Sequence, residues 1–439
     1  MKRKLTYVLL STALSVCLVT ACSCSEATVP ETNQTAEKEF TIHYLTAKSM
    51  EEGAVKSIVK IADMYQKEHP GFRFEVESIE DRTAYLQKLK ILASNDALPE
   101  WFDSDADSFF SNLAREGQVA DIDALYEELG VTDKIFENAK EYQRLEDGFL
   151  GLICWQGNTE YFWYNKKSFE KAGITQTPKT FEELLDACER LEEAGVIPIS
   201  VAGGVTWPLL RYLAFLPFRR TGNDFIEQAR RGQTSFGSPV GLEATDFMVR
   251  IGQYFQPGWS TADSAAAIEL VISGEAAITY DGTWRVPYFV DENKELKEEI
   301  GYFQLPALDS EDVTGAGDYW AHAGVGTAIR KDAMDDHMKE FLEFVFSYYP
   351  AVSLYEYDTI PSIMPEIRKE LSGFYKELIY NYAHVNTYAY TWDVRVDSAS
   401  NEVLGRETLN LALGNITAGE WAERMDQAVR EHVQGTLDQ

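Results

Sequence analysis

The most constraining feature of the chain is a regular exchange between two apolar periodicities near its start. Residues 39–45 and 72–78 alternate apolar and polar positions, as half-buried strands do. Between them, residues 51–69 repeat apolar positions at helical spacing and end at Pro70-Gly71. A second helical pattern leads into Leu98–Asp103. This β-α-β-α-β order predicts a mostly parallel sheet covered by helices.

The same rhythm returns later in the chain. Thr180-Phe-Glu-Glu183 is a capping-box pattern that opens a helix closed by Gly195. Further strands are expected at residues 160–164, 196–201, 276–280, 300–305 and 324–330. Because 439 residues exceed what one ordinary core organises, we expect two α/β lobes.

The N-terminus has the features of an export signal. A basic Lys2-Arg3-Lys4 precedes an apolar run too short for a comfortable membrane span, and small residues then abut Cys22. Val19-Thr-Ala-Cys22 resembles the bacterial lipobox, which would make Cys22 the lipid-modified first residue of the mature protein. Cys24 is a second candidate, and an ordinary signal peptide with a chance cysteine is the alternative. We therefore expect a signal peptide at 1–21 and a flexible polar tether at 22–38.

Composition excludes some partners and offers no cofactor site. A formal net charge of −31 argues against nucleic acid and against a broad electrostatic grip on anionic lipid. The six histidines are scattered, no phosphate-binding glycine loop is complete, and Asp103-Ser-Asp-Ala-Asp107 lacks the later ligands of a calcium loop. We expect no metal, no cofactor and no catalytic residues, although 71 acidic residues leave room for an unseen catalytic carboxylate pair.

Tryptophans beside turn residues are the clearest candidates for ligand contact. Each stands next to Pro, Gly, Asp or Asn, or at an expected strand end, and an aromatic face there can stack on a sugar ring. For any one of them, packing at the edge of a lobe is the alternative. The six are Trp101, Trp155, Trp207, Trp284, Trp320 and Trp392.

Several motifs, taken in order, resemble the family-1 extracellular solute-binding proteins, the sugar-capturing components of ATP-binding-cassette (ABC) importers. The matching stretches are Leu98-Pro-Glu-Trp-Phe102, Gly117-Gln-Val-Ala-Asp-Ile122, Tyr164-Asn-Lys-Lys167 through Ile174, Gly274-Glu-Ala-Ala-Ile278 through Trp284, and Leu413-Gly-Asn-Ile-Thr-Ala-Gly419-Glu-Trp-Ala422. Each motif alone is loose, and their order and spacing carry the likeness. It covers nearly all residues from 39 to 439.

The resemblance implies a two-lobed periplasmic-binding-protein-like α/β fold (class II, type 2). Each lobe would be a mostly parallel sheet flanked by helices, and chain crossovers would form a hinge near Gln156–Thr159. Lobe 1 would hold residues 39–156 and about 320–357. Lobe 2 would hold about 157–319 and 358–439.

The resemblance also implies a ligand site between the lobes, with Trp284 as the best-founded member because the family's tryptophan there commonly stacks on ligand. The other expected ligand-binding residues are Thr46, Lys48, Glu51, Asp103, Ser104, Asp105, Trp155, Asn158, Trp207, Asp281, Trp320, Trp392 and Arg395.

The expected function is capture of a carbohydrate, an oligosaccharide given the number of rings, for delivery to an ABC permease. We expect a monomer held by a lipid anchor on the outer face of the cell membrane of a Gram-positive-type bacterium. Two alternatives stay open: a surface lipoprotein that hydrolyses glycans, and an adhesion or sensor lipoprotein that binds glycans without transport.

Overall fold

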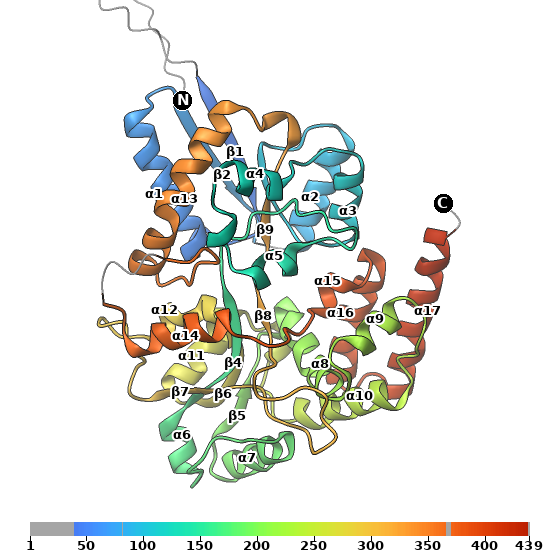
Figure 1. Cartoon of the computed structure of the whole chain (residues 1–439). Helices are drawn as coiled ribbons and strands as arrows, with labels where there is room; N and C mark the ends of the chain where they lie inside the picture. Colours follow the sequence, from blue (N-terminus) through green and yellow to red (C-terminus); the bar gives the residue numbers. More distant parts are fainter. Residues whose placement is uncertain (1–38, 81, 366–369, 438–439) are drawn as a thin grey trace, which may run out of the picture. The chain divides into compact units, whose positions relative to one another are not determined.

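The computed structural model describes residues 39–80, 82–365 and 370–437, which form one compact unit of helices and two β-sheets (Figure 1). The expected signal peptide, the tether and both candidate lipidation cysteines lie outside the described residues. Among the described residues, no helix combines the length and the apolar character that crossing a membrane requires.

The first sheet has the strand order β2-β1-β3-β9, and helices pack on both of its faces. Its strands are β1 (Phe40–Thr46), β2 (Phe72–Ser78), β3 (Trp101–Ser104) and β9 (Gly326–Ile329). The helices of this half are α1 (Gly53–Glu68), α2 (Arg82–Ser94), α3 (Ser108–Arg115), α4 (Ile122–Glu128), α5 (Glu137–Gln143) and α13 (Asp336–Glu356), with short 3-10 turns η1 (Thr132–Lys134) and η5 (Lys331–Ala333).

Alternation along these strands places successive side chains in two different cores. Tyr44 and Trp101 pack with α1 and α13, whereas Leu45 and Phe102 pack with α2 and α3 on the other face. Figure 1 shows α1 and α13 on one side of this sheet and α2 and α3 on the other. β1 pairs in parallel with β2 and with β3, so the mostly parallel sheet predicted here is confirmed.

The second sheet has the order β5-β6-β4-β7, with β8 paired to the start of β4. Its strands are β4 (Asn158–Asn165), β5 (Ile197–Ser200), β6 (Ala276–Gly282), β7 (Ile300–Phe303) and β8 (Ala321–His322). The remaining helices are α6 (Lys166–Lys171), α7 (Phe181–Glu193), α8 (Trp207–Thr221), α9 (Asp224–Arg230), α10 (Pro239–Gly252), α11 (Ser264–Ser273), α12 (Val286–Phe289), α14 (Gly373–Ala383), α15 (Trp392–Arg395), α16 (Ser398–Ala412) and α17 (Ala418–Leu437), with 3-10 turns η2 (Gly203–Val205), η3 (Trp259–Thr261) and η4 (Thr283–Arg285).

The expectation of a mostly parallel second sheet is wrong. β4 runs antiparallel to β6, β7 and β8, and only β5 and β6 are parallel. Strands buried on both faces carry the same apolar pattern in either direction, so periodicity does not report pairing direction. β4 enters this sheet from the first half of the molecule rather than through a local β-α-β unit, and it therefore runs against its neighbours.

The residues at the two ends of α7 adopt the capping roles that the sequence predicts. Thr180 caps α7, because its hydroxyl accepts the Glu183 backbone N–H at 3.1 Å, and Gly195 follows the helix with φ +67°. The Glu183 carboxylate accepts the N–H of Lys179 at 2.7 Å, one residue before the donor a capping box predicts.

Three chain segments cross between the two sheets side by side. The N–H of Ser362 donates to the Trp155 carbonyl at 3.0 Å, and the N–H of Gly157 donates to the Ile360 carbonyl at 2.9 Å. On the other edge, Asn158 and Thr159 pair with β8. From Glu160 onward the strand pairs with β6. β4 thus belongs to the crossing at one end and to the second sheet at the other.

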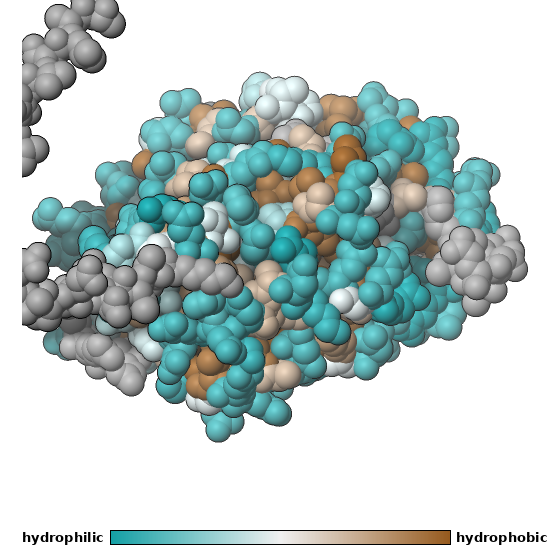
Figure 2. All heavy atoms as spheres, turned by 90° about the horizontal axis from the view of Figure 1, so that it is seen from above, coloured by the Kyte–Doolittle hydropathy of each residue, from teal (hydrophilic) through white to brown (hydrophobic). Residues whose placement is uncertain are grey.

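The visible face in Figure 2 is mostly hydrophilic, with apolar residues in separate groups. This agrees with 71 acidic and 40 basic residues in the chain.

Candidate functional site

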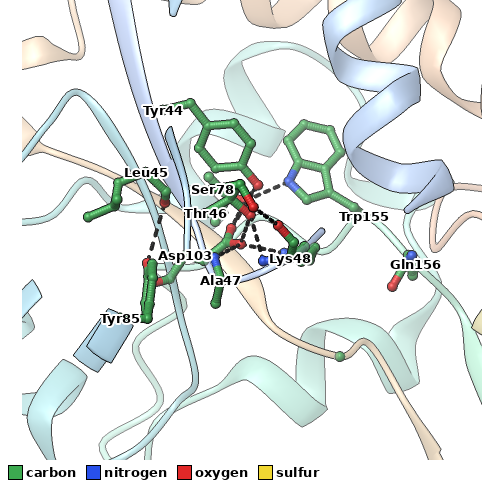
Figure 3. A network of polar contacts seen from close by, with 12 residues as sticks. Tyr44, Leu45, Thr46, Ala47, Lys48, Ser78, Tyr85, Asp103, Trp155 and Gln156 are labelled. Atoms are coloured by element: carbon green, nitrogen blue, oxygen red, sulfur yellow. Dashed lines mark hydrogen bonds and ion pairs between the residues drawn. The ribbon is translucent and has the colours of Figure 1, made fainter. Parts of the chain in front are cut away.

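Asp103, at the end of β3, is the centre of a buried polar network (Figure 3). Its carboxylate accepts five hydrogen bonds. The donors are Thr46 Oγ1 (2.5 Å), Lys48 Nζ (2.8 Å), Ala47 N (3.2 Å), Tyr44 Oη (2.9 Å) and Thr327 Oγ1 (2.8 Å). A carboxylate offers about four lone-pair positions, so this one is saturated. Asp103 holds the loop after β1 against the sheet and has no free acceptor for a ligand.

The other residues expected in this region make contacts of their own, apart from the Asp103 network. Ser104 is buried and its hydroxyl donates to the Asp105 carbonyl at 3.2 Å, while the Asp105 carboxylate forms an ion pair with Arg82. Glu51 is exposed and pairs with Lys56 at 2.5 Å, so it points to solvent. The structure thus brings Thr46, Lys48 and Asp103 together, and leaves Glu51 apart from them.

Trp207 and Trp284 form a half-buried aromatic pair on the second half of the molecule, called here the tryptophan pair. Their ring centroids are 5.7 Å apart and their planes meet at 67°. Trp207 begins α8, and Trp284 lies in η4 directly after β6. Two rings that are neither core nor fully exposed present apolar faces beside polar groups, which is the composition of a ligand site.

The chain before each ring of the pair is constrained, by space at Gly282 and by backbone conformation at Thr206. A Cβ on Gly282 would lie 2.0 Å from the Trp284 ring, so glycine is what lets the ring fold back over the strand end. Thr206, the residue before Trp207, has φ +56° and ψ −41°. For a β-branched residue this conformation costs roughly 1–3 kcal/mol, and strain of this kind gathers at functional sites.

Beneath the tryptophan pair lies a buried charged network that the sequence analysis did not predict. Arg211 donates through Nε to both oxygens of Glu160, at 3.1 and 3.0 Å, and through Nη1 to Asp393 at 3.2 Å. The Arg211 guanidinium lies 5.2 Å from the Trp207 ring centre. Burial would raise the pKa of Glu160, but Arg211 and the nearby His322 outweigh it and hold that pKa below its usual value.

His322 supports the second ring of the pair. The Gly324 N–H donates to His322 Nδ1 at 3.0 Å, so the ring proton is on Nε2, which donates to Glu160 Oε1 at 3.0 Å. The Trp284 ring centre is 5.5 Å from the His322 ring. Arg211 and His322 therefore fix both tryptophans from below through one shared carboxylate.

Asp281 and Arg285 connect the tryptophan pair with the Asp103 side. Asp281 is 5% exposed, and Arg285 Nε lies 3.5 Å from its carboxylate. Burial raises the pKa of Asp281 to about 6, against the opposing effect of Arg285. Glu52, just before α1, has its pKa raised by burial and is stabilised in its charged form by Lys48 and Arg285. Arg285 thus opposes the rise in pKa of one carboxylate from each half of the molecule, Asp281 and Glu52.

The structure places three of the expected tryptophans inside the protein. Trp155 is 1% exposed, packs against Trp101 and Tyr349, and donates to Thr327 Oγ1 at 2.8 Å. Trp320 (1% exposed) and Trp392 (4% exposed) are enclosed in the core of the second half. None of these rings has a free face on which a sugar could stack.

The last two expected residues are also engaged within the protein. Asn158 is buried and its amide donates to Gln156 Oε1 at 3.3 Å. The Arg395 guanidinium stacks over the Tyr390 ring at 3.8 Å.

Among the residues described, no cluster of three or more His, Cys, Asp or Glu side chains is placed to hold a metal ion. Cys154 and Cys188 are unpaired and buried, and burial raises the pKa of both thiols.

The described residues thus form an α/β fold of two sheets joined by three crossovers. A family model described as bacterial extracellular solute-binding protein matches residues 47–348. The chain belongs to that family.

Curated relatives match over part of their length. An uncharacterized ABC transporter extracellular-binding protein of Pyrococcus horikoshii is 30% identical over 146 residues, which is 33% of this chain and 33% of that protein. A probable sugar-binding periplasmic protein of Rhizobium meliloti is 27% identical over 184 residues, 41% of this chain and 44% of that one. The chain therefore spans less than half the length of these two relatives.

Solved structures match over almost the whole fold. A chitin oligosaccharide binding protein has a TM-score of 0.78 at 22% identity, covering 90% of this chain and 99% of that one. A sugar transporter from Arthrobacter chlorophenolicus with bound laminaribiose has a TM-score of 0.68 at 16% identity, covering 89% and 99%. At these identities the likeness establishes the fold.

Proposed function

We propose that the protein is a receptor that binds an oligosaccharide on the tryptophan pair and delivers it to an ABC permease. The observation that carries the proposal is the pair itself, Trp207 and Trp284, half-buried and backed by charged groups. Aromatic faces suit the C–H faces of sugars, and the Asp281 carboxylate beside them suits hydroxyl groups. The Rhizobium relative's name and the laminaribiose in the Arthrobacter structure support this ligand class.

Lobe closure is part of the proposal. Lobe 1 would comprise residues 39–156 and about 320–357, lobe 2 about 157–319 and 358–439, and the three crossovers would be the hinge. A hinge of this kind concentrates motion in a few backbone positions, and ligand stabilises the closed form by binding it better than the open one. The permease would then read the closed form.

The anchor and the cell surface complete the proposal. Membership of an extracellular solute-binding family supports a place outside the membrane. A lipid on Cys22, or on Cys24, would tether a monomer to the outer face of a Gram-positive-type membrane. Mass spectrometry of the N-terminal peptide from cells carrying Cys22→Ala or Cys24→Ala would identify the modified residue. An N-terminal peptide without lipid in the unsubstituted protein would contradict the anchor at either site.

Ligand binding is tested with a glycan panel on the protein without residues 1–21, followed by calorimetry and tryptophan fluorescence. Trp284→Ala should weaken binding of the sugar found by at least about tenfold, with the thermal midpoint nearly unchanged. The matched control is Tyr288→Ala, which removes an exposed ring four residues away (44% exposed) and should leave binding intact. If no sugar binds while a peptide or phosphate ester does, the proposal fails.

Binding without catalysis is supported by the engagement of four carboxylates at the site. Asp103 is saturated by donors, Glu160 is held by Arg211 and His322, Asp105 by Arg82, and Asp281 by Arg285. Hydrolysis of a glycosidic bond needs one carboxyl group as acid and another free as base or nucleophile. Incubation of the bound oligosaccharide with the protein should release no reducing ends. Release that disappears in Asp281→Asn would make the protein a hydrolase.

A measurement of sugar uptake by cells distinguishes a role in transport from a role in adhesion or sensing. Deleting the gene should abolish uptake of the radiolabelled sugar, and unchanged uptake would favour a glycan-binding lipoprotein outside transport.

A further inference from the structure

Four cations around the candidate site are each paired with a carboxylate of the protein itself. The pairs are Lys48–Asp103 (2.8 Å), Arg82–Asp105, Arg211–Glu160 (3.0 Å) and Arg285–Asp281 (3.5 Å). They come from both halves of the molecule, so the neutralisation extends across the whole site.

Two further carboxylates have no cation of their own. Asp393 shares Arg211 with Glu160, at 3.2 Å from Nη1, and its side chain is 28% exposed. Glu52 is half-buried and lies within electrostatic range of Lys48 and Arg285, both already paired. The site therefore carries more carboxylates than cations.

Burial makes two of these pairs, Lys48–Asp103 and Arg211–Glu160, hard to exchange. The side chains of Lys48 and Arg211 are 6% exposed, and those of Asp103 and Glu160 are 0% exposed. At these two pairs an incoming anion would have to take a cation from a buried carboxylate, which leaves an uncompensated charge in a low-dielectric environment. Hydroxyl groups of a neutral sugar make no such demand.

We infer that the ligand is an uncharged oligosaccharide, and that the site selects against acidic glycans of the same size. The inference rests on the proposed sugar-binding function and adds the charge class of the ligand. Amino sugars are compatible with the site, because Glu52 and Asp393 remain available to a cation. Uronic acids, sulfated sugars and sugar phosphates are the classes rejected.

The test uses trisaccharides that differ chiefly in charge: galactotriose against trigalacturonic acid, cellotriose against its C6-carboxylate form, and chitotriose against the glucosamine trimer. Calorimetry is run at about 10 mM and about 150 mM salt, where the screening length falls from about 30 Å to about 8 Å. For each of the two comparisons with an acid in which the neutral sugar binds, the acidic sugar should bind at least about tenfold more weakly. The higher salt concentration should reduce this difference in affinity. The glucosamine trimer should bind within about threefold of chitotriose or better.

Two charge variants distinguish the effect of a carboxylate at the site from the effect of the protein's net charge. Glu52→Gln should reduce the preference for the neutral member severalfold, whereas Asp63→Asn removes one charge from an exposed position on α1 and should leave that ratio unchanged. An acid that binds as well as its neutral partner, or better, overturns the inference and leaves the receptor function standing. If no sugar of any charge binds, the proposed function itself fails.

Discussion

Gly282→Ala tests whether the position of the Trp284 ring governs ligand binding. A Cβ at residue 282 would lie 2.0, 2.2 and 2.4 Å from Cζ3, Cη2 and Cε3 of Trp284. Carbon atoms in ordinary contact are about 3.5 Å apart or more, so the ring must move by more than about 1 Å. Gly282 has φ −100° and ψ 176°, an extended conformation that alanine adopts without strain. The substitution thus displaces one ring without deforming the backbone.

We expect Gly282→Ala to weaken sugar binding by about 1–2 kcal/mol, or roughly 5- to 30-fold, the scale of one aromatic contact. Calorimetry measures binding, and urea unfolding checks that stability changes little. Gly419→Ala is the matched control, because it adds a methyl group to an exposed helical position with nothing within 4 Å. In the Trp284→Ala background, Gly282→Ala should have no further effect. Normal binding by Gly282→Ala, or a further loss in the double variant, would refute this account of the ring.

Three other substitutions follow from the same region. Thr206→Gly should raise the free energy of unfolding by about 1 kcal/mol, because relief of backbone strain exceeds the entropy cost of glycine. It should also weaken sugar binding, because Trp207 is held less firmly. A free energy of unfolding that urea unfolding finds unchanged would contradict the strain at residue 206. Arg211→Met should destabilise the fold by about 3–5 kcal/mol because it leaves Glu160 buried and unpaired, and adding Glu160→Gln should recover part of the loss. Asp281 has a folded-state pKa of about 6, above its usual 3.8, so its contribution to stability is fully present below about pH 4 and is lost as the pH rises through 6. Relative to Asp281→Asn, the wild type should lose up to about 3 kcal/mol across that window, and parallel stability curves from pH 4 to 7 would contradict the assigned pKa.

Much of the fold was predictable because apolar periodicity and capping chemistry are local. The strand predicted at 39–45 and the helix at 51–69 match β1 and α1 closely, and Gly195 ends α7 as expected. The direction of β4 was not predictable, because direction depends on the path by which the chain enters the second sheet.

The site was harder to predict because a tryptophan beside a turn looks the same whether its ring is exposed or enclosed. Trp284 and Trp155 both follow this pattern, yet only Trp284 keeps an accessible face. The sequence contains only weak indications that Arg211 and His322 belong to the site. Arg211 stands four residues after Trp207 on one helix face, and His322 gains its role only when the crossover brings it under Trp284. Contacts between distant segments are set by tertiary structure, which no local pattern encodes.

The pairing of β3 with β9 has a consequence for how the protein acquires its structure. Trp101 lies opposite Ile329, so the first sheet remains one strand short until the chain has supplied a segment more than 200 residues further along. Long-range pairing of this kind closes a large loop and slows folding. The N-terminal half therefore cannot mature by itself as the chain emerges, and both halves should reach the native state together. A chain stopped before residue 326 would carry an open sheet edge, with the aggregation risk that such edges bring.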